Sequence, residues 1–275
     1  MINFINKDMT LRKASLSRKK TEEGFIDTHC HCLPGLDDGP AAITSSVVLC
    51  NKLIEDNITT VAATPHQLGR YTGQNSSQKI RDTVNQMNEE IKNSGQSLKI
   101  LPGAEVHLDE RLCKLIETDE VMTLGDNGRY ILLELPQDVF INIEPLFTEL
   151  ASMGIRTIIA HVERITVLAA QPKILRRWIE KPVFMQITAS SLLGKFGKDV
   201  ARTSWELLFS GSAAIVASDS HDIKLRRPCM TEAFECIRLY AGEEIARKVC
   251  IENPSQIIAG KDIETAALYE RLASK

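Results

Sequence analysis

The chain has 275 residues, of which 43% are hydrophobic and 25% charged, and its formal net charge is −3. A chain of this length can bury one large core or two modest ones, and we expect a single domain over residues 24–275. A slightly acidic chain without a sustained basic stripe is not built to neutralise phosphates, so we exclude DNA and RNA as stable partners. No apolar run approaches the length of a membrane span, so we expect no membrane insertion.

The amino terminus and the cysteines indicate the compartment. The first 20 residues carry six Lys or Arg side chains against one Asp and lack the apolar stretch of a secretory signal. We therefore expect residues 1–23 to form a disordered basic tail. The chain has seven cysteines, an odd number, without a CxxC pair. This usage is typical of a reducing compartment, and we expect a cytoplasmic protein.

From residue 24 onward, short β-rich runs alternate with helical patterns, which is typical of a parallel α/β fold. Polar residues gather at the carboxyl end of each run, where barrels and doubly wound sheets place their sites. Seven such repeats favour a closed or nearly closed barrel over an open doubly wound sheet, which would focus its site on one or two loops. The predicted strands are 24–31, 58–66, 98–107, 129–136, 156–164, 183–191 and 213–222.

Helices are predicted between these strands. Apolar residues at three- and four-residue steps indicate amphipathic helices over 41–56 and 78–93. Residues from 243 onward predict closing helices that are interrupted at Pro254. The predicted apolar stripes consist of Ile43, Val47, Cys50 and Ile54 in the first helix, and of Ile80, Val84, Met87 and Ile91 in the second.

All six histidines lie in segments that end predicted strands: DTHCH, ATPH, GAEVH, IIAH and ASDSH. His29 and His31 are two residues apart, so their imidazoles share one strand face while Cys30 and Cys32 point to the other. The two thiols are therefore poor candidates as ligands. One buried histidine usually packs in a core, but a pair on one face with acids close behind indicates a metal site.

Acidic side chains occur at the same strand ends. Glu105 and Glu134 follow apolar runs, where an unpaired carboxylate is costly to bury, so each needs an arginine, hydrogen-bond donors or a cation. Asp37 and Asp38 follow His31, and either of them could be a ligand. Taken together with the histidines, the economical account is that the carboxylates neutralise divalent ions.

The stronger candidates exceed the coordination number of one ion, so they imply two or three ions bridged by a carboxylate. Mixed imidazole and carboxylate donors without thiolate suit Mn²⁺, Fe²⁺, Zn²⁺ or Co²⁺. His107 is the weakest histidine and could be a supporting or an exposed residue. The candidate metal ligands are His29, His31, Asp38, His66, Glu105, Glu134, His161, Asp219 and His221.

Arginines near these segments could clamp a phosphate ester, because a planar guanidinium binds phosphoryl oxygens bidentately. Arg164 and Arg226 are the candidate catalytic residues, and Arg227 is the alternative to Arg226. Each of them could instead form a salt bridge at the rim. Other polar residues could line the pocket or face solvent, namely Arg70 and Tyr71 after His66, and Gln186, Thr188 and Ser190 on the sixth strand.

The ordered segments DTHCH, DDGP, ATPH, PGAE, LLELP, AHVER, QITASSLLGKFGK, ASDSH and RRP resemble the polymerase and histidinol phosphatase (PHP) superfamily. Within it, the chain is most similar to the bacterial manganese-dependent tyrosine-protein phosphatases of capsular and exopolysaccharide gene clusters. The resemblance covers about residues 24–260. It implies a distorted (β/α)₇ TIM-like barrel, the PHP domain, with three divalent metal ions, for which Mn²⁺ is the first choice.

The resemblance also distributes the ligands among the ions. It implies that Glu105 bridges the first and second ions, and that Arg164 and Arg226 lie near the phosphate. The first ion would take His29, His31, Glu105 and Asp219, the second Glu105, Glu134 and His161, and the third Asp38, His66 and His221.

The function implied is a metal-dependent protein-tyrosine phosphatase that attacks phosphotyrosine with a metal-bridged hydroxide. No CxxxxxR phosphate loop is present, so no phosphocysteine is expected. The expected partner is a phosphotyrosine protein, the tail of a bacterial tyrosine kinase of polysaccharide export. One alternative is a PHP-type small-molecule phosphatase such as a histidinol-phosphatase. Another is a non-catalytic metal-stabilised scaffold, which the loss of ligands would mark.

Overall fold

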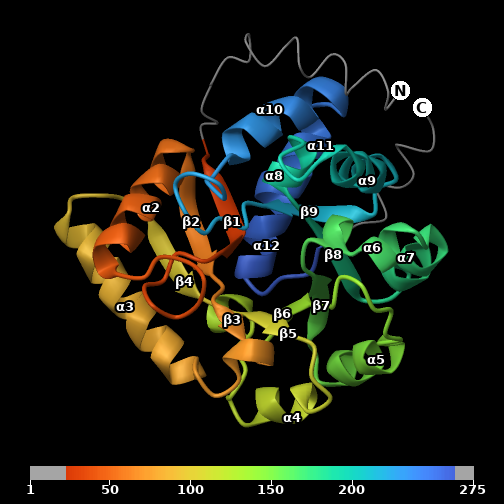
Figure 1. The fold of residues 1–275 in the computed structure, drawn as a ribbon, viewed down its shortest axis with the longest axis horizontal. Helices are drawn as coiled ribbons and strands as arrows, with labels where there is room; N and C mark the ends of the chain where they lie inside the picture. The colour runs from red at the N-terminus through yellow and green to blue at the C-terminus, as the bar shows by residue number, and fades with distance from the viewer. Residues whose placement is uncertain (1–22, 264–275) are drawn as a thin grey trace.

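The computed structural model describes residues 23–263, in which strands and helices alternate along the chain (Figure 1). The predicted tail therefore lies almost wholly outside the described residues and stays a prediction. The strands are β1 (Phe25–Cys30), β2 (Ile58–Ala63), β3 (His66–Gln67), β4 (Lys99–Pro102), β5 (Glu105–His107), β6 (Tyr130–Glu134), β7 (Arg156–Ile159), β8 (Val183–Thr188) and β9 (Ala213–Ala217). The α-helices are α2 (Ile43–Glu55), α3 (Ser77–Asn93), α4 (Leu112–Glu117), α5 (Glu144–Ser152), α6 (Thr166–Ala169), α7 (Pro172–Ile179), α8 (Ala189–Leu192), α9 (Lys198–Phe209), α10 (Met230–Tyr240), α11 (Glu243–Arg247) and α12 (Asn253–Ile258).

The strands form two parallel sheets, in the orders β1-β2-β4 and β3-β5-β6-β7-β8-β9. Two predicted strands are each divided between the sheets. The run 58–66 breaks into β2 and β3 ahead of Pro65, which has no N–H for a ladder, and the run 98–107 breaks into β4 and β5 at Gly103. The seven predicted strands are thus recovered, and the α/β class with a distorted TIM-like arrangement is confirmed.

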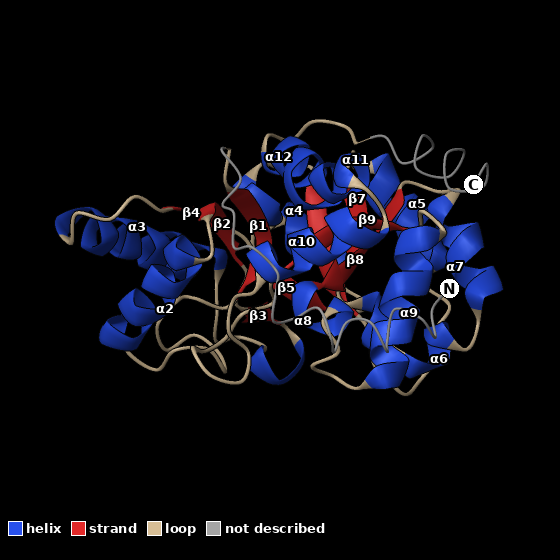
Figure 2. Cartoon of the chain, turned by 90° about the horizontal axis from the view of Figure 1, so that it is seen from above, coloured by secondary structure: helices blue, strands red, loops and turns tan. Residues whose placement is uncertain are grey.

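The first and last strands are joined by a short contact. Cys30 and Ser220 form an isolated parallel bridge, His31 N–H donates to the Ser220 carbonyl at 2.9 Å, and Asp219 N–H donates to the His29 carbonyl at 2.8 Å. Figure 2 shows the strands in the interior with helices around them. These bonds bring the ends of β1 and β9 side by side.

In β6, β7 and β8, successive apolar residues belong to two different cores, as the period of two in a strand requires. The larger core lies under the surrounding helices. The smaller one contains Leu132, Ile158 and Phe184, and Ile257 of α12 packs against it. Asn253 of α12 donates to the Ala214 carbonyl at 2.8 Å. Glu134 and Gln186 follow two residues after Leu132 and Phe184 on the same faces, so the polar carboxyl ends lie above this smaller core.

The predicted helices are present with one correction. The whole stripe of α3 from Ile80 to Ile91 is buried as expected. In α2 the predicted stripe lies at the edge of the buried face: Cys50 is buried, and Ile43, Val47 and Ile54 are partly buried and pack against the core. The buried face is Ser46, Leu49, Cys50 and Leu53. The interruption near Pro254 is a π-helical turn (Lys248–Glu252), after which α12 begins. None of the described helices has the length and apolarity that a membrane crossing requires.

Asp27, in the middle of β1, ties this strand to the segment after β9. Its carboxylate is fully buried and accepts from Ser218 N–H at 2.9 Å and from the Ser218 hydroxyl at 2.5 Å. Burial raises the pKa of Asp27, and the bonds from Ser218 oppose that rise. The pair therefore fixes the chain just before Asp219.

We expect Ser218→Ala to lower the free energy of unfolding by about 1–3 kcal/mol, because the buried Asp27 carboxylate loses a donor. Urea denaturation followed by circular dichroism measures the change. The control Ser152→Ala removes an exposed hydroxyl at the end of α5 and should stay within about 0.5 kcal/mol of the parent. Equal midpoints for Ser218→Ala and the parent would contradict this role of Asp27.

Candidate metal centre

The candidate ligands lie at or just beyond the carboxyl ends of the strands. The register places His66 of β3 beside Glu105 of β5, and His107 of β5 beside Glu134 of β6. The isolated bridge between β1 and the segment after β9 brings His31 toward Asp219. Parallel strands put their carboxyl ends at one edge, so residues far apart in sequence meet there.

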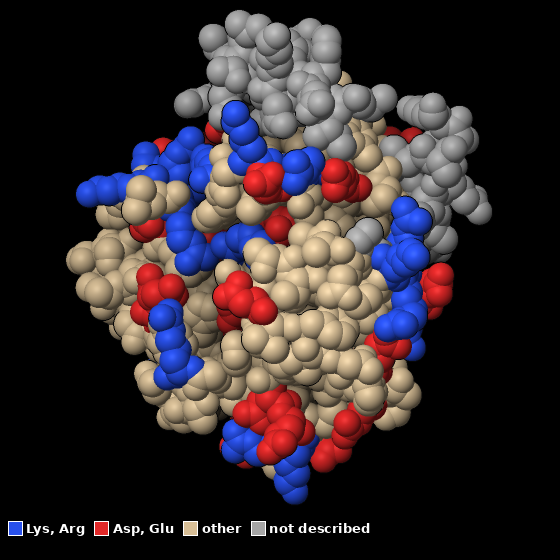
Figure 3. All heavy atoms as spheres, turned by 45° about the vertical axis from the view of Figure 1, so that its right-hand side comes forward, with Lys and Arg blue, Asp and Glu red and all other residues tan. Residues whose placement is uncertain are grey.

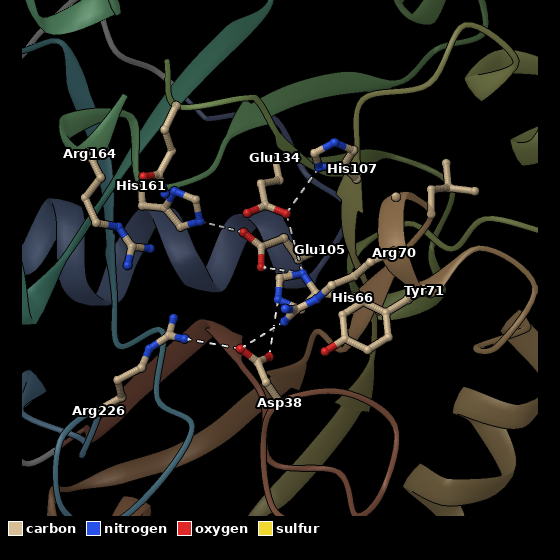
Figure 4. A pocket seen from close by; sticks show the side chains of 13 residues that line it. Asp38, His66, Arg70, Tyr71, Glu105, His107, Glu134, His161, Arg164 and Arg226 are labelled. Carbon is tan, nitrogen blue, oxygen red and sulfur yellow. Dashed lines mark hydrogen bonds and ion pairs between the residues drawn. The ribbon is translucent and has the colours of Figure 1, made fainter. Parts of the chain in front are cut away.

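All nine predicted ligands meet in four overlapping groups, in each of which the ligand atoms lie within 4.8 Å of one another. Figure 4 shows several of them pointing toward one another across the pocket. The groups are His29, His31 and Asp219; His29, Glu105 and His161; His66, Glu105 and Glu134; and His31, Asp38, His66 and His221.

In the first group, two imidazoles turn lone pairs toward each other. His29 Nδ1 lies 2.9 Å from Gln186 Oε1, and His31 Nδ1 lies 2.6 Å from Asp37 Oδ2. Both partners are acceptors, so the Nδ1 atoms carry protons, and in the neutral form of each ring the Nε2 atom carries the lone pair. These Nε2 atoms are 3.2 Å apart.

Two carboxylates face these imidazoles, Asp219 of the same group and Glu105 of the next. Glu105 Oε2 is 3.2 Å from Nε2 of both His29 and His31, and Asp219 Oδ1 is 3.4 and 3.6 Å away from the same two atoms. All four side chains are buried. Four acceptors that converge in a buried space repel one another unless a cation binds between them. The donor set therefore fits a divalent ion.

Glu105 links this group to the next ones. Its Oε1 lies 2.7 Å from His161 Nε2, and its Oε2 lies 3.2 Å from His66 Nδ1. Glu134 Oε2 is 3.5 Å from the same His66 nitrogen. A carboxylate with each oxygen facing different imidazoles has the arrangement expected of a bridging ligand.

The structure distinguishes the roles of the two adjacent aspartates. Asp37 points away from the groups: it accepts from His31, from Gly39 N–H at 2.9 Å and from His66 N–H at 3.2 Å. Asp38 belongs to the fourth group, 3.4 Å from Nε2 of both His66 and His221. Glycine at position 39 is required because a Cβ there would collide with the His31 carbonyl. Asp37 thus orients an imidazole, and Asp38 faces the centre.

Two candidate ligands have strained backbones. His161 and Asp219 have φ values of 31° and 52°, in the left-handed region that non-glycine residues rarely adopt. The predicted strands 156–164 and 213–222 therefore end early, at Ile159 and Ala217. The side chain of His161 reaches Glu105 of β5, and that of Asp219 lies near His29 and His31 at the end of β1.

The charges of the centre depend strongly on one another. Burial alone would raise the pKa of Glu105 and Asp219, but the facing imidazoles and, at Asp219, the arginines hold both well below their ordinary range. Burial would lower the pKa of His31, yet Asp37 and Glu105 raise it to about 10. Burial lowers the pKa of His221 to about 4, which keeps that imidazole neutral. The carboxylates that face His31 thus favour a positive charge at this position.

The two predicted arginines lie beside Asp219. Arg164 Nη2 donates to Asp219 Oδ2 at 2.5 Å, and Arg226 Nη2 donates to both Asp219 oxygens at 2.8 Å. Arg226 Nη1 also lies 3.8 Å from Asp38. Both side chains line a cavity of about 410 Å³ together with His66, Glu105, Glu134 and His161 (Figure 4). The guanidinium groups therefore face the same space as the candidate ligands.

The remaining candidates divide between the rim and the scaffold. Arg227 pairs with Glu232 at 3.5 Å, so Arg226 and not its neighbour faces the cavity. Arg70 and Tyr71 line the cavity, and the Tyr71 ring lies parallel to that of His66 with centroids 5.4 Å apart. His107 lines the cavity too and lies 3.5 Å from Glu134.

Of the three polar residues of the sixth predicted strand, only Gln186 contacts the side chain of a candidate ligand with its own side chain. That ligand is His29. Thr188 bonds to Glu163 and caps α8, and Ser190 contacts Cys229. The sequence did not decide whether Gln186 supports the site or faces solvent. The available signal was its position two residues after Phe184, on the same face of the strand. Cys30 and Cys32 are buried in the larger core, away from the ligand groups, as predicted.

The chain is similar to a described family and to named proteins. The family model described as capsular polysaccharide synthesis, CpsB/CapC, matches residues 25–259. A putative tyrosine-protein phosphatase CapC of Staphylococcus aureus is 34% identical over 79% of this chain and 85% of the relative. The tyrosine-protein phosphatase YwqE of Bacillus subtilis is 33% identical over 80% of this chain and 87% of the relative.

Solved structures show the same likeness. One from work on YwqE of Bacillus subtilis and CpsB of Streptococcus pneumoniae, described as unique metal-dependent tyrosine phosphatases, matches with a TM-score of 0.83 at 30% identity. The match covers 87% of this chain and 96% of that one. A lactonase of Listeria monocytogenes, with a TM-score of 0.54 at 13% identity over 87% of this chain and 95% of its own, shares the fold alone. The chain therefore belongs to the capsular polysaccharide synthesis CpsB/CapC family.

Proposed function

We propose that this chain is a metal-dependent protein-tyrosine phosphatase. The observation that carries the proposal is the convergence of five imidazoles and four carboxylates in overlapping groups, beside a cavity that two arginines line. The names of the relatives support the same activity, because CapC, YwqE and CpsB are each called tyrosine-protein phosphatases. All nine candidate positions carry a residue that can bind a metal. This argues against a non-catalytic scaffold, which the loss of ligands would mark.

The proposal includes three divalent ions, with Mn²⁺ the first choice. His29, His31, Glu105 and Asp219 would hold the first, and Glu105 would be shared with a second held by Glu134 and His161. Asp38, His66 and His221 would hold the third. Two observations support this division: Glu105 faces four imidazoles with its two oxygens, and Asp38 lies between those of His66 and His221.

When bound, divalent ions lower the pKa of coordinated water and neutralise phosphoryl oxygens. The residues of the chain would then bind and orient the ester. Arg226, 29% exposed, and the more buried Arg164 are placed to donate to the phosphoryl oxygens as charge develops on them. Asp219 holds both guanidiniums toward the cavity before substrate arrives, which lowers the cost of ordering them.

The leaving group and the cysteines fit this chemistry. The phenol of tyrosine has a pKa near 10, so phenolate departs more readily than an alkoxide and needs less help from a general acid. The described cysteines offer no nucleophile at the centre: burial raises the pKa of Cys30 to about 11, and its side chain lies in the core. Hydrolysis without a phosphocysteine follows.

The proposed partner is a phosphotyrosine protein, and within that class the tail of a bacterial tyrosine kinase of polysaccharide export. The family description, capsular polysaccharide synthesis, supports this choice. We also propose a cytoplasmic location. The support is that none of the seven cysteines, all of them within the described residues, forms a disulfide, as is usual in a reducing compartment.

The first test is hydrolysis of p-nitrophenyl phosphate and a phosphotyrosine peptide by purified protein with Mn²⁺. Activity should vanish after exhaustive dialysis against EDTA, return with Mn²⁺, and exceed the activity on histidinol phosphate. Elemental analysis should find three ions per chain, and His161→Ala should bind fewer and lose turnover. Activity that survives complete metal removal would contradict the proposal. Higher activity on histidinol phosphate than on the phosphotyrosine peptide would contradict the proposed substrate.

The second test separates the adjacent arginines. Arg226→Ala should lower kcat/KM for both substrates by about 10²–10³-fold, because a preorganised donor to the phosphoryl group is lost, while the metal content is unchanged. Arg227→Ala is the matched control, since that side chain pairs with Glu232, and it should keep kcat/KM within about threefold of the parent. Equal effects of the two substitutions would contradict the assignment of Arg226.

The third test uses the pH dependence of the metal-free protein. The folded pKa of His31 is raised from 6.5 to about 10, so its contribution to stability is complete below pH 6.5 and is lost as the pH rises through 10. Thermal unfolding in EDTA should show a decline of the order of a few kcal/mol across this window. Asp37→Asn should flatten the decline, because it removes the main charge that raises this pKa. A metal-free protein equally stable at pH 6.5 and 10 would contradict the pairing of His31 with Asp37.

A further inference from the structure

Two chain segments that line the catalytic cavity continue beyond it. Glu105 and His107 line the cavity from one segment, and Glu134 and Gln137 line it from the other. The segments are joined where Leu108 N–H donates to the Glu134 carbonyl at 3.1 Å. Beyond this bond, residues 108–111 and Ile141 line an open groove of about 620 Å³. The groove therefore leads away from the cavity, and we name it the 108–141 groove.

The loop on one side of the 108–141 groove exposes three consecutive apolar side chains. Val139, Phe140 and Ile141 are 60%, 39% and 41% exposed. Exposed apolar residues in sequence, next to a catalytic cavity, are typical of a binding surface. They lie between Gln137, which faces the cavity, and α5.

This loop is anchored to the body of the protein. The Thr166 hydroxyl donates to the Gln137 carbonyl at 2.9 Å. The apolar side chains of the loop also close over a small gap that Leu135 and Trp178 line from the other side. A surface that is already held in place loses little conformational entropy when a ligand covers it.

The other side of the groove is acidic. Asp109 and Glu110 supply two carboxylates, and the Arg111 guanidinium bonds to Asp109 at 2.8 and 2.9 Å. Glu110 therefore leaves this side with an excess negative charge. In Figure 3, Asp and Glu with flanking basic side chains gather at the bottom of the molecule, the level of α4 in Figure 1, and uncharged surface lies above them.

We propose that the 108–141 groove binds the extended polypeptide that flanks the phosphotyrosine, an inference that rests on the proposed function. A phosphotyrosine side chain that fills the cavity leaves its backbone at the mouth, where the groove begins. An apolar residue of the substrate packs against Val139 and Ile141, and a Lys or Arg residue lies near Glu110. A second copy of the chain fits less well, because three exposed apolar residues fall far short of the roughly 800 Å² per partner of a stable interface.

The test compares two phosphotyrosine peptides and p-nitrophenyl phosphate with the Mn²⁺-loaded protein. One peptide has leucine and lysine on both flanks, and the other has serine and glutamate at the same places. The parent should show a kcat/KM about tenfold higher for the first peptide. Ile141→Ser should reduce this preference to about threefold, and Glu110→Lys should abolish or reverse it. Both variants should hydrolyse p-nitrophenyl phosphate within about twofold of the parent, since neither side chain lines the catalytic cavity.

The matched control is a substitution of an exposed apolar residue far from the groove in sequence. Val48→Ser changes an apolar residue of α2 that is 44% exposed, and it should leave every rate unchanged. Equal kcat/KM for the two peptides in the parent would overturn the groove alone and leave the proposed function standing. Hydrolysis of p-nitrophenyl phosphate without either peptide would overturn both. A parent dimer that Ile141→Ser converts to monomer in light scattering would show an interface between copies and overturn the inference.

Discussion

The crowding of lone pairs at the mouth of the barrel is the constraint on which the rest of the structure depends. His29 and His31 face each other through Nε2 atoms 3.2 Å apart, and a carboxylate oxygen of Glu105 lies equally close to both. In a buried space such an arrangement is costly unless positive charge enters it. Protons or metal ions can supply that charge, and Asp37 and Glu105, which face His31, raise its pKa to about 10.

A second layer of residues holds this arrangement in place. Asp37 and Gln186 each accept the Nδ1 proton of one imidazole and so fix its tautomer and ring orientation. Asp27 and Ser218 fix the backbone on the two strands where the barrel ends meet. The left-handed turns at His161 and Asp219 persist because this surrounding network determines them. The packing of the barrel thus maintains a geometry that its ligands alone would not adopt.

The surroundings of the cavity differ from one side to the other. On one side Arg164 and Arg226 bond to Asp219, where they suit the phosphoryl group of an ester. On another side, the chain segments that line the cavity lead on to the 108–141 groove, with its apolar loop and its acidic residues. The proposed phosphatase would therefore separate two tasks. The arginines and metals would recognise the phosphate that all substrates share, and the groove would recognise the polypeptide that carries it.

The sequence by itself determined the seven strand regions and the polar residues that follow their apolar runs. Apolar runs with polar carboxyl ends predict parallel strands, and parallel strands bring those ends to one edge, so the meeting of His66, Glu105 and Asp219 followed from periodicity. Their roles as metal ligands stay a prediction. Only the tertiary structure decided between Asp37 and Asp38 and between Arg226 and Arg227. Adjacent residues in a loop have similar sequence signals, and backbone direction, which distant hydrogen bonds such as those of Asp37 fix, selects the one that faces the centre. The buried face of α2 was decided in the same way, by what packs against it rather than by its own pattern.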